Sequence, residues 1–180
     1  MGLFKKAPSP HQTTLAMVGA QPGDRVLVAG RPDPRVVAEL ARTTGLSGQT
    51  LIAIDTPAKA AYDAAAADAG VLVETLDVAT GSTRLPDTGV HHDVVVLHFD
   101  LAALAGDART TLAADAMAAL RPGGRVVIIE GRRQTGWFGS RPATLGTDAL
   151  LAILQGAGGL AVRTLGSVDG ISYFEARKTR

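Results

Sequence analysis

The chain contains no cysteine, and only 4% of its 180 residues are aromatic. The absence of cysteine excludes disulfides, thiolate nucleophiles and Cys-ligated metals. Because 46% of the residues are hydrophobic but few are aromatic, the core must be built mainly from Ala, Val and Leu. A formal net charge of +1 provides no general attraction for nucleic acids or acidic membranes.

No apolar run approaches the ~18 residues that a membrane-spanning helix needs. The apolar part of residues 1–7 is also too short for a signal peptide. We therefore expect a cytoplasmic protein. The length suits one ordinary domain, which we place at residues 13–180, after a flexible lead-in of residues 1–12.

The stretch from residue 25 to residue 55 has the pattern of a β-α-β unit. Arg25–Gly30 is short and rich in Val and Leu, which is typical of a strand buried on both faces. Asp33 and Pro34 fit the N-cap and the first position of a helix, and Gly45 fits its end. A second apolar run ends on Asp55. The pattern predicts two parallel strands joined by a helix.

Such a unit carries a binding site at a fixed place. Ligands of open parallel sheets bind beyond the carboxyl ends of the strands, where the crossovers diverge. Gly30 occupies the first strand-to-helix turn, and Asp55 at the tip of the second strand is within reach of a ribose diol. The unit predicts a ligand that contains a nucleoside.

The rest of the chain continues the alternation of strand and helix patterns. We expect helices at 13–18, 56–69, 107–120 and 147–155, strands at 71–75, 94–98 and 125–130, and a hairpin of 162–165 with 172–176. This order predicts an α/β fold: a Rossmann-like, doubly wound, mostly parallel seven-stranded sheet with a C-terminal antiparallel hairpin.

From about residue 21 to residue 178, this order resembles the class I S-adenosylmethionine-dependent methyltransferases. The segments that carry the resemblance are Gly23–Gly30, Ile54-Asp55, Leu76–Val78, Leu85-Pro86 with His92–Val95, Leu120–Arg125 and Gly158–Val162. The helix-to-strand turn in Leu120–Arg125 is the most specific of these. The small-molecule enzymes related to quinone biosynthesis are the most similar branch.

The resemblance implies S-adenosylmethionine as cofactor and a small molecule as methyl acceptor. It implies that Asp55 holds the ribose hydroxyls and that Asp77 accepts from the adenine amino group beside the Val78 backbone. The cofactor-binding residues expected from it are Gly30, Asp55, Thr56, Asp77, Val78 and His98. Structural roles are the alternative, because Gly30 suits a tight turn, Asp55 a helix start and Asp77 a loop.

Histidines offer a weak catalytic candidate and no expected metal site. His98 falls where the fourth strand should end, where it could act as a base, line the adenosine pocket, or pack without chemistry. His91-His92-Asp93 looks like a metal cluster, but neighbouring strand residues point to opposite faces, so we expect no metal there.

The first turn departs from the family pattern. Val28 stands where an acid is usual, and Pro32 and Pro34 replace glycines. Proline removes an amide donor and adds a ring. The alternative interpretation is therefore a degenerate, non-catalytic methyltransferase fold that serves as an interaction or accessory subunit. A nicotinamide-dependent enzyme is less favoured, since the turn lacks the G-x-G-x-x-G series.

The connection over residues 131–146 is long for a compact domain, and connections of this length are often lids or binding loops. It carries Trp137 and Phe138 among arginines. These aromatics could cover a substrate, contact a protein partner or a membrane, or fold back as a small satellite core. The chain has no basic stripe, so we expect no nucleic-acid partner.

Overall fold

The computed structural model describes residues 10–131 and 144–180. The strands are β1 (Arg25–Gly30), β2 (Gln49–Ile54), β3 (Glu74–Asp77), β4 (His92–His98), β5 (Leu120–Glu130), β6 (Leu160–Val168) and β7 (Ile171–Arg177). The helices are α1 (Pro10–Val18), α2 (Pro34–Thr44), α3 (Thr56–Ala69), α4 (Gly106–Ala119) and α5 (Thr147–Gly156), with a short 3₁₀ helix, η1, at Leu101–Ala103.

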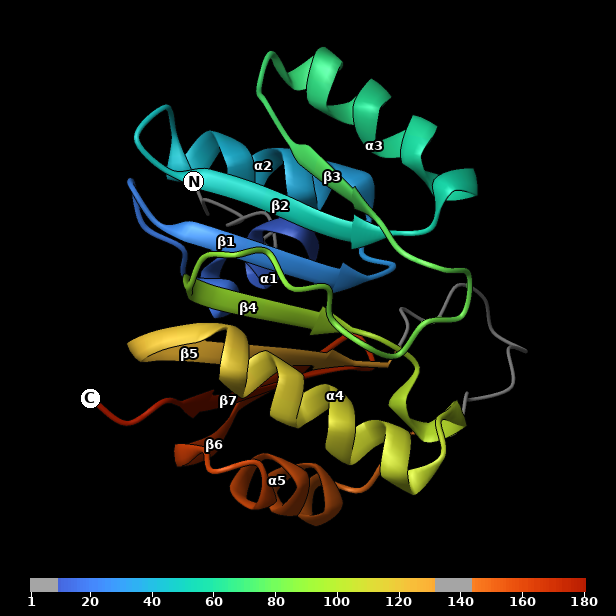
Figure 1. Ribbon diagram of the computed structural model, residues 1–180, viewed down its shortest axis with the longest axis vertical. Helices are drawn as coiled ribbons and strands as arrows, with labels where there is room; N and C mark the ends of the chain where they lie inside the picture. Colours follow the sequence, from blue (N-terminus) through green and yellow to red (C-terminus); the bar gives the residue numbers. More distant parts are fainter. Residues whose placement is uncertain (1–9, 132–143) are drawn as a thin grey trace, which may run out of the picture.

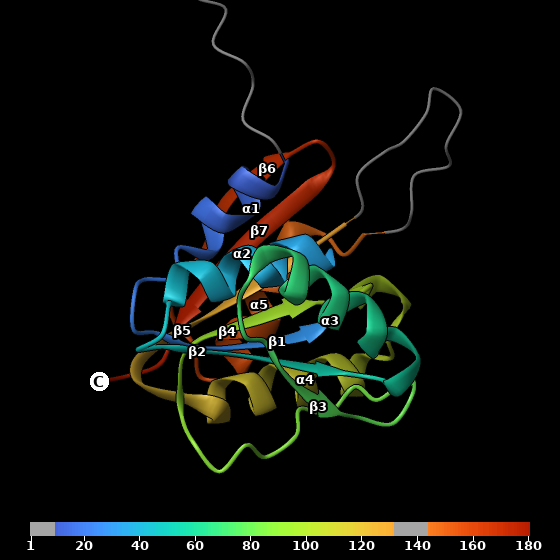
Figure 2. The same cartoon turned by 90° about the horizontal axis from the view of Figure 1, so that it is seen from above.

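The strands form one seven-stranded sheet in the order β3-β2-β1-β4-β5-β7-β6. β1 to β5 are parallel to their neighbours, whereas β7 pairs antiparallel with both β5 and β6. Helices lie on both faces of the sheet, with α1, α2 and α3 on one side and α4 and α5 on the other (Figures 1 and 2). The predicted fold class is confirmed.

Alternate side chains along the central strands enter two separate hydrophobic layers. Leu27 and Ala29 of β1 pack in the layer that contains Leu112 of α4. Val26 and Val28 pack in the opposite layer, with side chains of α2. A strand buried on both faces explains why β1 has no polar alternation. It also gives Val28 a purely structural place in the core.

The β1-α2-β2 unit has the predicted helix signals. The Asp33 carboxylate accepts a hydrogen bond from the Arg35 amide at 2.9 Å, and Pro34 occupies the first turn of α2. Gly45 ends the helix with φ 67°, a conformation that favours glycine. These local signals are sufficient to begin and end α2 where the sequence predicts.

Three boundaries differ from the sequence prediction. α1 begins at Pro10 rather than residue 13, because proline is well accommodated in a first helical turn. β3 is Glu74–Asp77 rather than 71–75, because pairing with β2 selects the residues after the apolar run. β5 begins at Leu120, which pairs with His92, so the predicted turn after it is an irregularity within the strand.

The C-terminal hairpin turns at Asp169-Gly170, where both residues have positive φ, 53° and 82°. Two such residues form the tight turn that matches the twist of antiparallel strands. The predicted hairpin is therefore present, with longer strands.

Of the helices in the described residues, none has both the length and the apolar character needed to cross a membrane. Trp137 and Phe138 lie outside the described residues.

Candidate functional site

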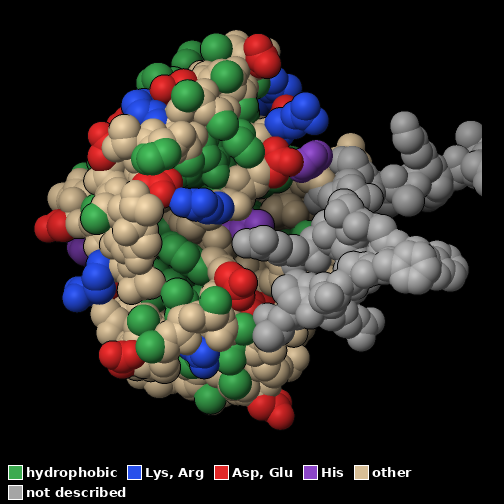
Figure 3. All heavy atoms as spheres, turned by 90° about the vertical axis from the view of Figure 1, so that its right-hand side faces the viewer, with side chains coloured by type: hydrophobic (Ala, Val, Ile, Leu, Met, Phe, Trp, Pro, Cys, Tyr) green, Lys and Arg blue, Asp and Glu red, His purple; other side chains and the backbone are tan. Residues whose placement is uncertain are grey.

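A cavity of about 360 Å³ lies at the edge of the sheet where the parallel strands end. The ends of β1, β2, β4 and β5 and the segment after β3 contribute its walls. Figure 3 faces this edge and shows acidic, basic and histidine side chains gathered around hydrophobic surface. This is the place where the β-α-β unit predicts a ligand.

The cavity brings together part of the predicted cofactor-binding set. Gly30, Asp55, Val78 and His98 line it. Thr56 and Asp77 are not part of the lining; they lie beside each other, with 3.5 Å between Thr56 Oγ1 and Asp77 Oδ1. The sheet order explains the grouping, because adjacent parallel strands end at one edge.

Gly30 is required by the packing of the backbone at this edge. Its φ is 100°, and a Cβ at this position would overlap the carbonyl group of His98 on β4. The Arg31 amide donates to that carbonyl oxygen at 2.9 Å. The glycine therefore lets the turn after β1 cross closely over the end of β4, whether or not a ligand is bound.

Asp55 is buried, with 6% of its surface exposed, and its two oxygens have different surroundings. Oδ2 accepts a hydrogen bond from Arg31 Nη2 at 2.7 Å. Oδ1 is buried and has no hydrogen-bond donor among the described residues. A ribose hydroxyl fits this unfilled acceptor. The Arg31 side chain is 72% exposed, so it can turn into solvent and release the second oxygen.

The two prolines do not fill the cavity. Neither Pro32 nor Pro34 belongs to its lining. The Pro32 carbonyl accepts a 2.7 Å hydrogen bond from the Tyr62 hydroxyl of α3, which anchors the turn. Burial, with a contribution from the charge of Asp33, raises the pKa of Tyr62 to about 12, so the hydroxyl stays protonated and donates. The space above the sheet edge is left for a ligand.

The sequence matches no protein-family model and no curated protein. Solved structures share its fold. The apo S-adenosylmethionine-dependent methyltransferase SibL superposes with a TM-score of 0.73 at 20% identity, over 95% of this chain and 55% of SibL. An S-adenosylmethionine-dependent methyltransferase from Aquifex aeolicus superposes with a TM-score of 0.73 at 16% identity, over 93% of this chain and 89% of the Aquifex chain. A putative O-methyltransferase from Nostoc punctiforme superposes with a TM-score of 0.74 at 15% identity, over 94% of this chain and 56% of the Nostoc chain.

The fold is that of the class I methyltransferases. The chain spans little more than half the length of SibL and of the Nostoc protein, and most of the length of the Aquifex protein.

Glu130, at the end of β5, is a cavity residue of this methyltransferase fold that the sequence analysis missed. It is 2% exposed. Burial raises the pKa of its carboxyl group, and the nearby charge of Asp100 adds to the effect. The signal in the sequence is an acid that ends a buried strand, as Asp55 ends β2.

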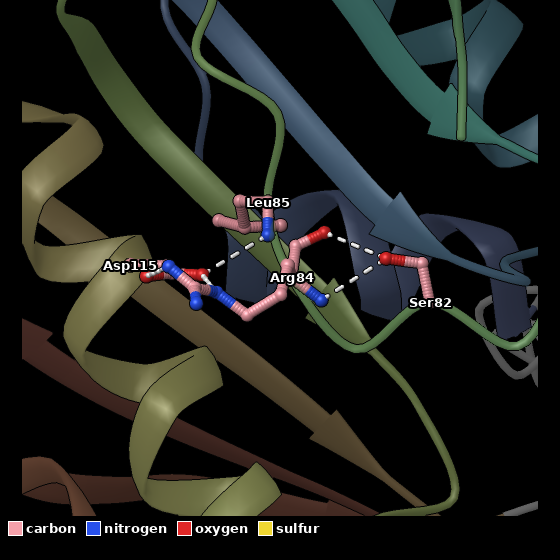
Figure 4. Close-up of polar contacts among 4 residues, drawn as sticks. All are labelled: Ser82, Arg84, Leu85 and Asp115. Carbon is pink, nitrogen blue, oxygen red and sulfur yellow. Dashed lines mark hydrogen bonds and ion pairs between the residues drawn. The ribbon is translucent and has the colours of Figure 1, made fainter. Parts of the chain in front are cut away.

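The segment after β3 forms another wall that sequence reasoning did not identify. Gly81, Ser82, Thr83 and Arg84 line the cavity. Arg84 donates to Asp115 of α4 from Nε at 2.6 Å and Nη2 at 3.1 Å, and the Leu85 amide donates to the same carboxylate at 3.2 Å (Figure 4). The Arg84 amide donates to Ser82 Oγ at 3.2 Å. α4 thus holds this wall in place.

His91, His92 and Asp93 lie at the other end of β4 from the cavity. His92 is buried, and its Nε2 is 2.9 Å from Thr88 Oγ1. Asp93 accepts from the Arg25 amide at 2.8 Å and from the Arg121 side chain. Across residues 10–131 and 144–180, no group of three or more histidine and acidic side chains is placed to hold a metal ion.

Proposed function

We propose that this protein is an S-adenosylmethionine-dependent methyltransferase that acts on a small molecule. The observation that supports this most strongly is the buried Asp55 carboxylate at the tip of β2, which has one oxygen without a donor among the described residues. A buried acceptor of this kind at the switch point of a parallel sheet suits the hydroxyls of a nucleoside ribose.

The cavity provides the remaining contacts in this proposal. Asp55 holds the ribose, the Val78 backbone and the neighbouring Asp77 contact the base, and the turn at Gly30 lies beneath the rest of the cofactor. S-adenosylmethionine supplies an electrophilic methyl group on a sulfonium sulfur. The protein contributes by aligning the acceptor and excluding water from the reacting centre.

A small methyl acceptor is consistent with the size and charge of the molecule. The cavity volume of about 360 Å³ falls within the range of small-molecule sites. The net charge of +1 offers no general attraction for a nucleic acid. One protein of the same fold is a putative O-methyltransferase, which suggests transfer to oxygen. The proposed relation to quinone-biosynthesis enzymes rests on the sequence motifs alone.

Calorimetric titration tests the proposal. We expect S-adenosylmethionine and S-adenosylhomocysteine to bind, and NAD not to bind. Asp55→Asn should weaken binding about ten- to hundredfold, because a charge-assisted hydrogen bond contributes about 1.5–3 kcal/mol. Asp68→Asn, an exposed acid on α3, is the matched control and should leave the affinity unchanged. Equal effects of the two substitutions would contradict the proposed role of Asp55.

The alternative function is a non-catalytic accessory subunit. The ion pair between Arg31 and Asp55 favours it, because the guanidinium occupies one of the two oxygens that a ribose would use. If none of the three ligands binds at millimolar concentration, the accessory role is supported instead.

A further inference from the structure

Two glutamates of the sheet are almost completely buried, and their surroundings are opposite in kind. Glu175 on β7 is 1% exposed and accepts hydrogen bonds from Arg163 and Arg177, each at 3.1 Å. Glu130 on β5 is 2% exposed, and no lysine or arginine of the described residues pairs with it. The two arginines explain the burial of Glu175. Within the described residues, the donors that face Glu130 are backbone amides, and burial of a carboxylate costs free energy unless its acceptor sites are filled.

The hydrogen bonds that Glu130 does receive are long. The Leu101 amide is 3.4 Å from Oε2, and the Leu145 amide is 3.4 Å from Oε1. The Ala102 amide is a third backbone donor to this carboxylate. A carboxylate has about four lone-pair sites, so these amides leave it some acceptor capacity. The side chain lines the cavity, where a ligand could fill that capacity.

The position of Glu130 separates it from the nucleoside end of the cavity. Asp55 follows β2 and Glu130 ends β5, and β1 and β4 lie between these strands. Three strand spacings of about 4.8 Å place the two strand ends about 14 Å apart. A ligand whose ribose contacts Asp55 therefore extends across β1 and β4 toward Glu130.

The side chains around Glu130 suit an apolar molecule with a polar group. Phe99 and Leu104, from the segment after β4, line the cavity together with Asp100. Apolar walls beside one buried acceptor match a compound that presents a hydroxyl group on a hydrophobic body. A second acid, Asp100, disfavours an anionic acceptor at this end.

We propose that Glu130 is the catalytic base of this site and binds the hydroxyl group of the methyl acceptor; this rests on the proposed methyltransferase function. Glu130 takes the hydroxyl proton, and the acceptor oxygen uses the freed electron pair to bond the methyl carbon as the carbon–sulfur bond breaks and its pair stays on sulfur. Burial raises the pKa of Glu130 above its ordinary value, which makes the carboxylate a stronger base.

Carbon-13 NMR of protein labelled at the glutamate carboxyl carbons tests this inference without relying on turnover. The labelled positions are Glu39, Glu74, Glu130 and Glu175. Glu130→Gln removes one signal and so assigns it. S-adenosylhomocysteine is added first, and phenol or anisole is then titrated, because these probes share a ring and differ in the hydroxyl hydrogen.

We expect phenol to shift the Glu130 signal saturably and to lower the pKa of Glu130, since a donated hydrogen bond stabilises the carboxylate. Anisole should cause a much smaller shift, and the Glu39 signal should not respond to either probe. Glu130→Gln should bind S-adenosylhomocysteine as tightly as the unmodified protein, as should the control Glu39→Gln.

The outcomes separate this inference from the function on which it rests. If S-adenosylhomocysteine binds but phenol leaves the Glu130 signal unmoved, or acts no differently from anisole, the role of Glu130 is overturned and the proposed function stands. If S-adenosylhomocysteine does not bind, the proposed function fails, and the role of Glu130 fails with it.

Discussion

At the scale of single residues, the Arg31–Asp55 contact competes with the proposed binding of a nucleoside. The Asp55 carboxylate is buried and the Arg31 side chain is largely exposed, so the pair can open without disturbing the core. Because the guanidinium is largely in solvent, which screens its charge, we expect the pair to contribute about 1 kcal/mol. A ligand that uses both oxygens of Asp55 must break this ion pair, which costs only a small part of its binding free energy.

Arg31→Ala should therefore strengthen the binding of S-adenosylhomocysteine, by up to about fivefold. Added salt should raise the affinity of the unmodified protein by weakening the pair, and should have little effect on the variant. Calorimetry at low and high salt measures both. Arg35→Ala, on the first turn of α2, is the control. Weaker binding by Arg31→Ala would mean that the guanidinium contacts the ligand rather than competing with it.

Glu130 predicts a particular dependence of stability on pH. Its pKa is raised by burial in the folded protein, whereas in the unfolded chain it is about 4.3. The folded state therefore holds the proton more tightly, and stability is lost as pH rises from the unfolded pKa through the folded one. Among the described residues, Asp100 is the titratable group whose charge acts on Glu130, and it raises the pKa further.

Glu130→Gln cannot ionise, so its free energy of unfolding relative to the unmodified protein should increase as pH rises from about 4 through the raised pKa of the folded state. Urea unfolding across this range measures the difference. Any constant cost of replacing a carboxylate oxygen by an amide cancels in this comparison. A difference that does not change with pH would show that Glu130 keeps its ordinary pKa.

At the scale of elements, α3 fixes the turn that carries Arg31. The Tyr62 hydroxyl of α3 donates to the Pro32 carbonyl, and both groups are buried. Tyr62→Phe should lower the free energy of unfolding by about 1–3 kcal/mol, because the carbonyl loses its partner. It should also alter the affinity for S-adenosylhomocysteine by loosening the turn.

Tyr173→Phe is the matched control for this prediction. The Tyr173 hydroxyl is also buried and lies 2.7 Å from Thr14 Oγ1, and Tyr173 is not part of the cavity lining. Urea unfolding should show a loss of stability for both variants. Calorimetry should show a changed affinity for S-adenosylhomocysteine in Tyr62→Phe alone. An unchanged affinity in Tyr62→Phe would show that the turn keeps its place without this bond.

The contact of α4 with the segment after β3 predicts a second effect on binding. Asp115 accepts three hydrogen bonds from Arg84 and Leu85, and the residues before Leu85 form a cavity wall. Asp115→Asn should weaken S-adenosylhomocysteine binding roughly two- to fivefold, since the ligand must then order that wall. Asp107→Asn, an exposed acid in the first turn of α4, should not. Calorimetry that gives equal affinities for the two variants would contradict a positioning role for Asp115.

The local signals of these elements explain how much of the fold the sequence could predict. The boundaries of α2 follow from Asp33, Pro34 and Gly45, which act within a few residues of themselves. The position of β3 does not, because its register is set by pairing with β2, a contact between residues distant in the chain. Leu120 enters β5 for the same reason.

In the candidate site too, some residues can be predicted from a short stretch of sequence, and others depend on contacts between distant segments. Asp55 could be predicted because an acid ends the second strand of a β-α-β unit, which is visible in one short stretch. The contact of Arg31 with Asp55 depends on how two loops meet in space. Glu130 ends a strand just as Asp55 does, but its place in the cavity follows from β5 lying beside β4. The wall held by Asp115 joins segments 31 residues apart.

At the scale of the whole molecule, the sheet order places Asp55 and Glu130, at the two ends of the cavity, on one edge of the sheet. β2 carries the acid proposed to hold the nucleoside, and β5 carries the base proposed to serve the acceptor, with β1 and β4 between them. The two hydrophobic layers cover the faces of the sheet, so the edge at the carboxyl ends of the strands is the part that stays open to a ligand. The methyltransferase fold thus supplies the arrangement, and a few side chains decide whether it is used.

The structure of the protein with S-adenosylhomocysteine at millimolar concentration is the most direct test of the central claim. We predict that both ribose hydroxyls lie within hydrogen-bond distance of the Asp55 carboxylate and that Arg31 has turned away from it. A structure in which Arg31 still contacts Asp55 and no nucleoside lies over the ends of β1 and β2 would contradict the claim.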